Sequence, residues 1–518
     1  MPSRSLPARP DLDHLKHEAK ALHKAFRDGD ADAARRVIAA IGDQHAIKLT
    51  DAQRVIAREY GFPTWARLRA HVQTARGFDE AVIAFLDAVQ EQNANGATRA
   101  LHAQPRIATE SLHVAAVLGL ANEARRLIAE DVSRVTTRIG RFSGDPLLFL
   151  CYSPFHGESA ERDAGLLATA RLLLDAGADP NTCDGRYGVP ALYAVTGVRS
   201  VLPIARLLLD AGANPTDGES VFHAAEHFHE DALELLLAAG AQLNEAGDWG
   251  NTPLYFLLRW WDVAKEARVR QGLIWLLDHG ANPNVVCGTE RENALHVAAR
   301  RGQDVSVIQL LIDHGADVHA RRGDGRTAWL LAQRRGFDEV AALLARAGAD
   351  TQPLSPLDAL LAACGHGDAE TAHRLSSPEL LRDLEQSDRV LLPDSASNDR
   401  GATVLACLAA GFPVDTTDAV GATALHHSAI HGRAPLVRAL LDAGASVAIR
   451  DTEHSSSPLG WACFGADYVA DPAGDYEGCV RALLDAGARL LADEYRPRHA
   501  GVRAVLERGG HRHFTVRH

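Results

Sequence analysis

The segment His223-Ala-Ala-Glu226-His227 sets two imidazoles and a carboxylate at the spacing of an HxxEH motif. Residues four apart share one face of a helix, as two zinc ligands would, and inverted zinc peptidases use this pattern. The sequence offers no third ligand at a set spacing. It also lacks the GxxxxGK[ST], GxSxG and strand-linked GxGxxG motifs. We therefore predict no metal, no cofactor and no catalytic residues.

Paired arginines suggest a different chemistry. Arg300-Arg301 and Arg334-Arg335 close the short segments ALHVAARRG and AWLLAQRRG, and GNTPLYFLLRWWD ends on Arg259, two Trp and Asp262. Arginine binds carboxylate or phosphate groups through two parallel hydrogen bonds. Tryptophan adds apolar contact area to a binding surface. These residues favour an anionic ligand.

Composition limits the function classes. The chain has 518 residues, 46% hydrophobic and 23% charged, which is ordinary for a folded protein, and a net charge of -13. This acidity argues against a generally basic nucleic-acid binder. The sequence has neither the apolar region of a signal peptide nor an apolar run long enough to span a membrane. Seven scattered Cys without a CxxC pair predict reduced thiols. We expect a cytoplasmic protein with no membrane partner.

The elements that must position these residues form a repeat. The phrase LLLDAGADPN recurs, and in VIQLLIDHGAD the apolar residues follow helical spacing before Gly315 ends the helix. A spacing near 33 residues is typical of stacked helix pairs, which bury their apolar faces only against each other. The glycine of the phrase falls at Gly177, Gly212, Gly240, Gly280, Gly315, Gly348, Gly444 and Gly487, and more weakly at Gly411.

These phrases resemble the ankyrin repeat family, best over residues 293–320 and 422–447. The resemblance covers roughly residues 110–490. It implies an all-α, ankyrin-type solenoid of stacked helix-turn-helix repeats with short β-hairpin loops, whose concave face mostly binds other macromolecules. Residues 151–166 and 262–272 carry insertions, and residues 376–402 are hard to align.

The resemblance also predicts a place for a ligand. Recognition residues in such repeats follow the Ala pair of the first helix, here Ala298-Ala299, or lie at the hairpin tip. Aligning the repeats yields one exposed column of basic and aromatic residues. Alternatively, the arginines only solvate exposed helix faces, and a Trp fills the gap left by an insertion. The predicted binding residues are His227, Phe228, Trp249, Tyr255, Arg259, Trp260, Arg300, Arg301, Arg334 and Arg335.

The same alignment explains His223 without a metal. It stands where other copies carry the His of an LH dipeptide, which in this family usually bonds to the backbone. Glu226 stands at the repeat position that Ala299 occupies in its own repeat, which is a core position, so we expect Glu226 to be partly buried. A buried carboxylate must be paired or have a shifted pKa. We expect pairing with His223 or Arg259, with a functional acid or base as the alternative.

The chain divides into five predicted segments. Leu12, Leu15, Ala19, Leu22 and Phe26 mark one face of a helix in a segment similar to a leader of bacterial ankyrin repeat proteins. The segments are a flexible N-terminus (1–10), a helical capping unit (11–75), a first block of repeats (78–350), a second block with degenerate repeats (351–490) and a basic C-terminal helix or tail (491–518).

Two functions fit these observations. The first is a non-catalytic protein–protein interaction scaffold that binds an acidic or aromatic partner segment on the concave face. The alternative is an enzyme, or a binder of an anionic small molecule. Its pocket would lie around Glu226, Trp249, Tyr255, Arg259 and Trp260. Nucleic acid is the least favoured partner because the chain is acidic overall.

Overall fold

The computed structural model describes residues 4, 6, 11–42, 44–247, 250–259, 266–491 and 493–509. Within these ranges the chain is built of helices, so the predicted all-α class is confirmed. Isolated antiparallel bridges close the loops between repeats, as in Cys287–Glu292 and Arg321–Thr327. The chain forms two compact units: residues 1–242 with 267–272, and residues 243–266 with 273–518.

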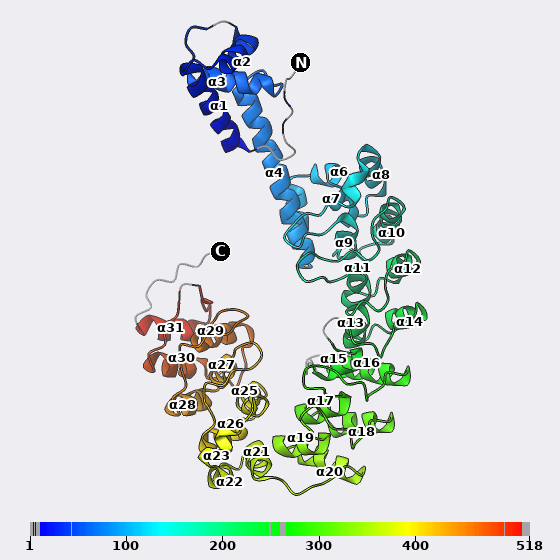
Figure 1. Cartoon of the computed structure of the whole chain (residues 1–518), viewed down its shortest axis with the longest axis vertical. Coiled ribbons are helices and arrows are strands. Elements are labelled where there is room, and N and C mark those ends of the chain that lie inside the picture. The colour runs from blue at the N-terminus through cyan, green and yellow to red at the C-terminus, as the bar shows by residue number, and fades with distance from the viewer. Residues whose placement is uncertain are drawn as a thin grey trace. The chain divides into compact units, whose positions relative to one another are not determined.

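The first unit begins with a helical bundle (Figure 1). Leu15, Ala19 and Leu22 are buried, as the helical spacing predicts, and pack with side chains of the next three helices. The fourth helix continues to Gln90, so the boundary predicted near residues 75–78 falls inside a helix. The bundle helices are α1 (Leu12–Arg27), α2 (Ala31–Ile41), α3 (Leu49–Glu59) and α4 (Trp65–Gln90).

The rest of the first unit is a series of helix pairs, of which the first few pack on the C-terminal half of α4. It includes a short 3-10 helix, η1 (Val132–Val135), and a π-helical turn, η2 (Ala194–Val198). The α-helices are α5 (Ala94–Ala103), α6 (Ile107–Glu110), α7 (Leu112–Val117), α8 (Ala121–Glu130), α9 (Pro146–Cys151), α10 (Ala160–Asp175), α11 (Ala191–Tyr193), α12 (Leu202–Asp210), α13 (Ser220–His227) and α14 (Glu230–Ala238).

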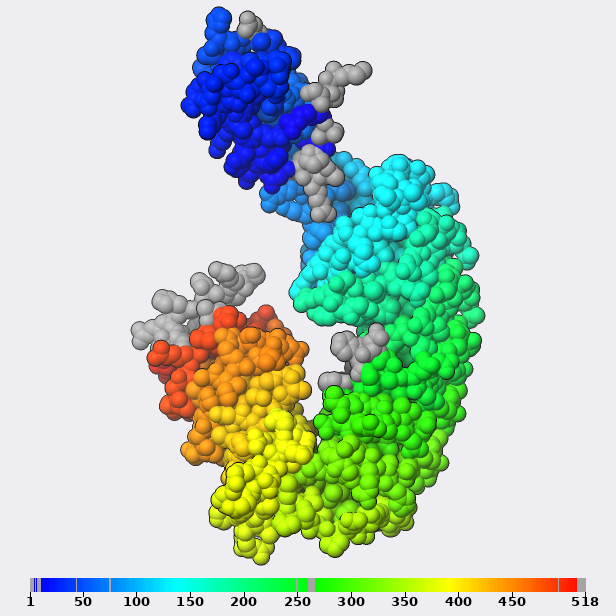
Figure 2. Space-filling model, viewed as in Figure 1, coloured from blue at the N-terminus to red at the C-terminus, as the bar shows by residue number. Residues whose placement is uncertain are grey.

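The second unit continues with further pairs, and helix α16 (Glu266–Asp278) contains residues of both units. Residues 356–485, which include α21 to α30, form one continuous yellow-to-orange mass in the space-filling view (Figure 2). The other helices are α15 (Pro253–Arg259), α17 (Ala294–Arg301), α18 (Val305–Asp313), α19 (Ala328–Arg335), α20 (Asp338–Arg346), α21 (Pro356–His366), α22 (Ala369–Leu375), α23 (Pro378–Arg382), α24 (Gln386–Arg389), α25 (Leu391–Ser397), α26 (Gly401–Ala410), α27 (Ala424–Ile430), α28 (Ala434–Asp442), α29 (Pro458–Tyr468), α30 (Tyr476–Asp485) and α31 (Ala500–Arg508).

The stacking changes at residues 376–402, the segment that is hard to align. Helix α19 packs on α21 as in a regular array, but α21 then packs on α26. Helix α25 packs on α26 and α27. The additional short helices α23 and α24 precede α25. This irregular step brings acidic residues of α24 and α25 to the arginine-rich end of α19.

Helices α17 and α19 each end at a glycine with left-handed backbone conformation. Gly302 follows α17 with φ 66° and Gly336 follows α19 with φ 70°. A Cβ atom at Gly336 would meet the backbone of Gly365 on α21. Glycine therefore ends α19 and also permits close packing of α19 on α21.

Two further sequence predictions concern the thiols and the membrane. The seven cysteines are free, and all but Cys183 are buried. Among helices of the described ranges, none combines the length and apolar character needed to cross a bilayer.

Candidate functional site

The predicted arginine pairs occupy equivalent places in the structure. Arg300 and Arg301 form the last turn of α17, and Arg334 and Arg335 form the last turn of α19. Positive side chains are favoured there because the free carbonyl groups give a helix C-terminus partial negative charge. Arg322 and Arg326 of the hairpin before α19 lie beside them. We call these six residues the arginine cluster: Arg300, Arg301, Arg322, Arg326, Arg334 and Arg335.

Glu292 holds one side of the arginine cluster. Its side chain is 1% exposed and accepts two hydrogen bonds from Arg300, at 3.0 and 3.1 Å, and one from Arg322 at 2.8 Å. Burial alone would raise the pKa of Glu292, but the two guanidinium groups outweigh it and lower the pKa. A buried carboxylate with such partners is stable as an anion.

Tyr255 connects this ion network to Arg259. The Tyr255 hydroxyl donates to Glu292 Oε2 at 3.3 Å and accepts from Arg259 Nη1 at 3.4 Å. Tyr255 is 1% exposed, so it cannot touch a partner directly as a surface residue would. The sequence predicts it as a binding residue, and the structure instead gives it a supporting position behind the arginines.

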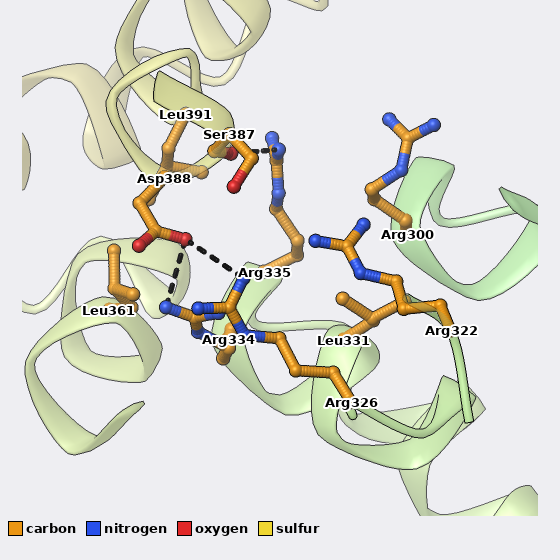
Figure 3. Close-up of a pocket in the computed structure, with 10 residues that line it drawn as sticks. All are labelled: Arg300, Arg322, Arg326, Leu331, Arg334, Arg335, Leu361, Ser387, Asp388 and Leu391. Carbon is orange, nitrogen blue, oxygen red and sulfur yellow. Dashed lines mark hydrogen bonds and ion pairs between the residues drawn. The ribbon is translucent and has the colours of Figure 1, made fainter. Parts of the chain in front are cut away.

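The expected exposure of Arg334 is wrong. Its side chain is 5% exposed because α21 and α24 cover it. Its Nη2 lies 2.9 Å from Asp388 Oδ1 and its Nε 3.1 Å from Asp358 Oδ1, although neither contact has good hydrogen-bond geometry. Asp388 also lies 3.7 Å from Arg326 (Figure 3).

Arg300 is also less accessible than expected, with a side chain 21% exposed. Arg335 is 11% exposed and lies 3.0 Å from Asp394 of α25. Arg301 is exposed and has no carboxylate partner among the described residues. Of the two predicted arginine pairs, Arg301 is therefore the member best placed to contact a partner.

Sequence reasoning missed the acidic half of this site. Glu292 lies two residues before α17, and Asp388 and Asp394 lie in the irregular segment 376–402. Acidic residues near a predicted arginine column could have indicated Glu292. No repeat register could have placed Asp388 opposite Arg334, because that segment does not follow the repeat.

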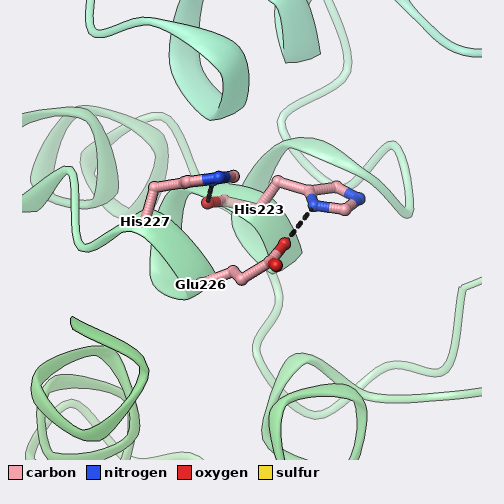
Figure 4. Close-up of side chains that lie close together, drawn as sticks. All are labelled: His223, Glu226 and His227. Atoms are coloured by element: carbon pink, nitrogen blue, oxygen red, sulfur yellow. Dashed lines mark hydrogen bonds and ion pairs between the residues drawn. The ribbon is translucent and has the colours of Figure 1, made fainter. Parts of the chain in front are cut away.

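The first unit contains the other sequence candidate. His223 Nδ1 lies 2.7 Å from Glu226 Oε2 (Figure 4). Its Nε2 lies 3.2 Å from Glu219 Oε2. Burial alone would lower the pKa of His223, but the hydrogen bonds to both carboxylates raise it to about 9. The expected pairing of Glu226 with His223 is confirmed.

The neighbouring His227 lies close enough to complete a set of three ligands. Atoms of His223, Glu226 and His227 that could bind a metal lie within 4.8 Å of one another. His227 Nδ1 contacts the His223 carbonyl at 3.0 Å. A metal would require His223 to lose the proton that Glu219 and Glu226 stabilise. The geometry fits a charged histidine between two carboxylates.

The remaining predicted residues belong to different units or lie outside the described residues. His227 and Phe228 are half-buried and belong to the first unit, whereas the arginine cluster belongs to the second. Trp249 and Trp260 lie outside the described residues. The single continuous column and the alternative pocket around Glu226, Tyr255 and Arg259 therefore stay predictions.

This architecture defines the class of the chain as a helical repeat solenoid, and comparisons with known families agree. Residues 263–355 match the family described as ankyrin repeats (3 copies), residues 221–263 match ankyrin repeats (many copies), and residues 420–452 match the single ankyrin repeat. The chain contains ankyrin repeats, as the resemblance predicts.

Relatives match parts of the chain. E3 ubiquitin-protein ligase KEG of Arabidopsis thaliana is 27% identical over 52% of this chain and 17% of its own length. Ankyrin repeat and SAM domain-containing protein 6 of Mus musculus is 39% identical over 18% of this chain and 10% of its own. Ankyrin repeat and SOCS box protein 11 of Pongo abelii is 29% identical over 31% of this chain and 46% of its own. This chain thus spans less than half of these relatives.

Among solved structures, the human ASB11 ankyrin repeat domain is similar to this chain, with 26% sequence identity and a TM-score of 0.34. The similarity covers 47% of this chain and 99% of that domain. The relatives named above come from eukaryotes. A bacterial source, expected from the leader segment, stays a prediction.

Proposed function

We propose that this chain is a non-catalytic protein–protein interaction scaffold whose second unit binds an acidic segment of a partner at the arginine cluster. Ankyrin repeats are in general protein–protein interaction modules, which supports the coarse part of the proposal. The observation that carries the finer part is Arg301. It is an exposed guanidinium at the end of a repeat helix, with further arginines beside it and no carboxylate partner among the described residues.

The electrostatic surroundings of Arg301 support this proposal. Desolvation together with repulsion from Arg300, Arg259 and Arg335 lowers the pKa of Arg301. Burial is the larger cause of this shift and repulsion the smaller one, and a bound anion would relieve the repulsion. The ion pairs of Arg300 with Glu292 and of Arg335 with Asp394 hold the neighbouring side chains in place.

The test is affinity capture with three versions of the full chain, read by mass spectrometry. Arg301→Glu reverses the exposed charge, so we expect it to lose partners that the wild type captures. Arg346→Glu is the matched control, because Arg346 is an exposed arginine in the last turn of the neighbouring helix α20. Capture should weaken with added salt, since exposed charges are screened over about 10 Å at 0.1 M. Equal recovery of partners by wild type and Arg301→Glu would exclude the arginine cluster as the binding site for those partners.

A further inference from the structure

A cavity of about 220 Å³ lies where the irregular step at α25 meets the ends of α17 and α19. Arg300, Arg301, Arg335 and Arg400 line it, with Asp394 and Ser395 of α25. Pockets for drug-sized ligands are larger, about 300 to 1,000 Å³. The cavity therefore suits one small chemical group. The neighbouring cavity beside Arg334 is about 20 Å³, enough for a water molecule only.

The charges that line the larger cavity do not balance. Arg300 is paired with Glu292, and Arg335 with Asp394. Arg301 and Arg400 have no carboxylate partner within the part of the chain that the structure describes. The cavity therefore carries an excess of about two positive charges, estimated as two unpaired guanidinium groups.

Arg400 is held in place but keeps free hydrogen-bonding capacity. Its Nη2 donates to the backbone carbonyls of Arg335 at 2.8 Å and Gly365 at 2.6 Å. Its guanidinium lies 4.7 Å from the centre of the Phe337 ring. Within the described residues, its Nε and Nη1 atoms have no partner. Desolvation and repulsion from Arg335 lower the pKa of Arg400, so this wall is electropositive.

Ser395 supplies an independent sign of a ligand. Its side chain is 2% exposed, and its Oγ atom is buried without a hydrogen-bond partner in the described structure. A buried hydroxyl without a partner costs about 1–3 kcal/mol, so such groups are rare unless they have a role. Ser395 is one of the residues that line the cavity, together with the two unpaired arginines.

We propose that this cavity binds a phosphate group, as a phosphomonoester dianion. This deepens the proposed function, since it uses the same Arg301. A phosphomonoester carries about -1.5 to -2 charge at pH 7, which matches the excess positive charge, and three acceptor oxygens. The donors come from the end of α17, from α25 and from the loop before α26, so they reach the ligand from several sides. A planar carboxylate would be satisfied by one guanidinium alone.

The test is isothermal titration calorimetry on the full chain with inorganic phosphate, O-phosphoserine and acetate. We expect both phosphates to bind one site and acetate to bind far more weakly. Ser395→Ala and Arg301→Gln should each weaken phosphate binding about tenfold or more, as expected when a hydrogen bond to a charged group is lost. Ser395→Ala breaks no hydrogen bond within the described protein, so its fold should remain intact. Arg346→Gln, the control, should bind like the wild type.

Affinity as a function of pH separates phosphate from carboxylate recognition. The second pKa of a phosphomonoester is about 6, so O-phosphoserine should bind several-fold more tightly at pH 7.5 than at pH 5.5. A phosphoserine peptide and glycerol 3-phosphate then compare the two sources of the group. Tighter binding of the peptide assigns the site to a phosphorylated partner protein, and tighter binding of glycerol 3-phosphate assigns it to a metabolite.

Two results would overturn the inference: no binding of either phosphate, or equal affinity for acetate. Neither result touches the proposed function, because capture of partners with plain acidic segments could still depend on Arg301. Conversely, phosphate binding with no partner lost in Arg301→Glu would leave the cavity as a small-molecule site and exclude the scaffold interface there.

Discussion

Histidines at one position of the repeat have pKa values shifted in opposite directions, and their immediate neighbours decide the direction. His113 and His426 bond to backbone carbonyls of Thr137 and Ser456, as the family resemblance implies. Burial lowers the pKa of both to about 4. His223 instead lies between Glu219 and Glu226, and its pKa rises to about 9. The repeat pattern predicts the position of the ring, whereas its charge depends on residues outside the pattern.

These pKa values predict opposite pH effects on folding. The raised pKa of His223 contributes stability that is full below pH 6.5 and lost as the pH rises through about 9. This contribution amounts to at most about 3 kcal/mol, from about 1.36 kcal/mol for each pKa unit. The lowered pKa of His113 costs stability as the pH falls from 6.5 toward 4. NMR titration of labelled histidines measures both, and His223→Gln should remove the loss between pH 6.5 and 9. A His223 midpoint near 6.5 would contradict the two-carboxylate arrangement.

At the scale of elements, the sequence predicts the helix pairs well, but it predicts less well which elements pack against them. Apolar spacing and the recurring glycine identify α17 with α18 and α19 with α20, because each pair follows local rules. The burial of Arg334 could not be predicted in this way. Its partner Asp388 belongs to the short helices α23 to α25, where no repeat spacing exists. Likewise, the cavity lined by Arg400 arises from the way α25 leaves the regular stack.

Glycines at helix ends permit a test of the close packing of α19 on α21. Gly336→Ala requires a left-handed alanine, which costs about 1–2 kcal/mol, and also places a Cβ against the backbone of Gly365. Gly348 has φ 94° and open space around its Cβ position, so Gly348→Ala has only the conformational cost. Urea unfolding should therefore show the Gly336 variant to be less stable than the Gly348 variant by more than about 1 kcal/mol. Equal losses would mean that α19 and α21 are not in close contact.

At the scale of the whole chain, a solenoid need not unfold in one step. Stability in repeat proteins is a sum of contributions from each repeat and its neighbours, so a local defect weakens the repeats around it most. Each of the two units has hydrophobic clusters of its own, such as the cluster around Leu15 in the first and the cluster around Leu425 in the second.

Glu292→Gln should show this locality. The change removes the charge that pairs with Arg300 and with Arg322, whose side chain is 2% exposed, at a cost of about 3 kcal/mol. Hydrogen exchange should then accelerate around α15 to α19, while α1 to α4 stay protected. Glu290→Gln is the control, since the Glu290 side chain is 53% exposed and surface changes usually cost less than about 0.5 kcal/mol. Equal acceleration in both units would mean that the chain unfolds as a single cooperative block.

The contact of Arg326 and Arg334 with Asp388 limits how this array can change in evolution or by engineering. Repeat arrays usually tolerate the gain or loss of a whole repeat, because each repeat touches only its neighbours. Here the pair α21 and α22 lies between the partners along the chain, and it carries Asp358, the other partner of Arg334. Deleting that pair would remove Asp358, and deleting or duplicating it would move Asp388 away from the buried guanidinium of Arg334. The chain length between α19 and α25 is therefore fixed by charge pairing, even though the sequence there follows no repeat.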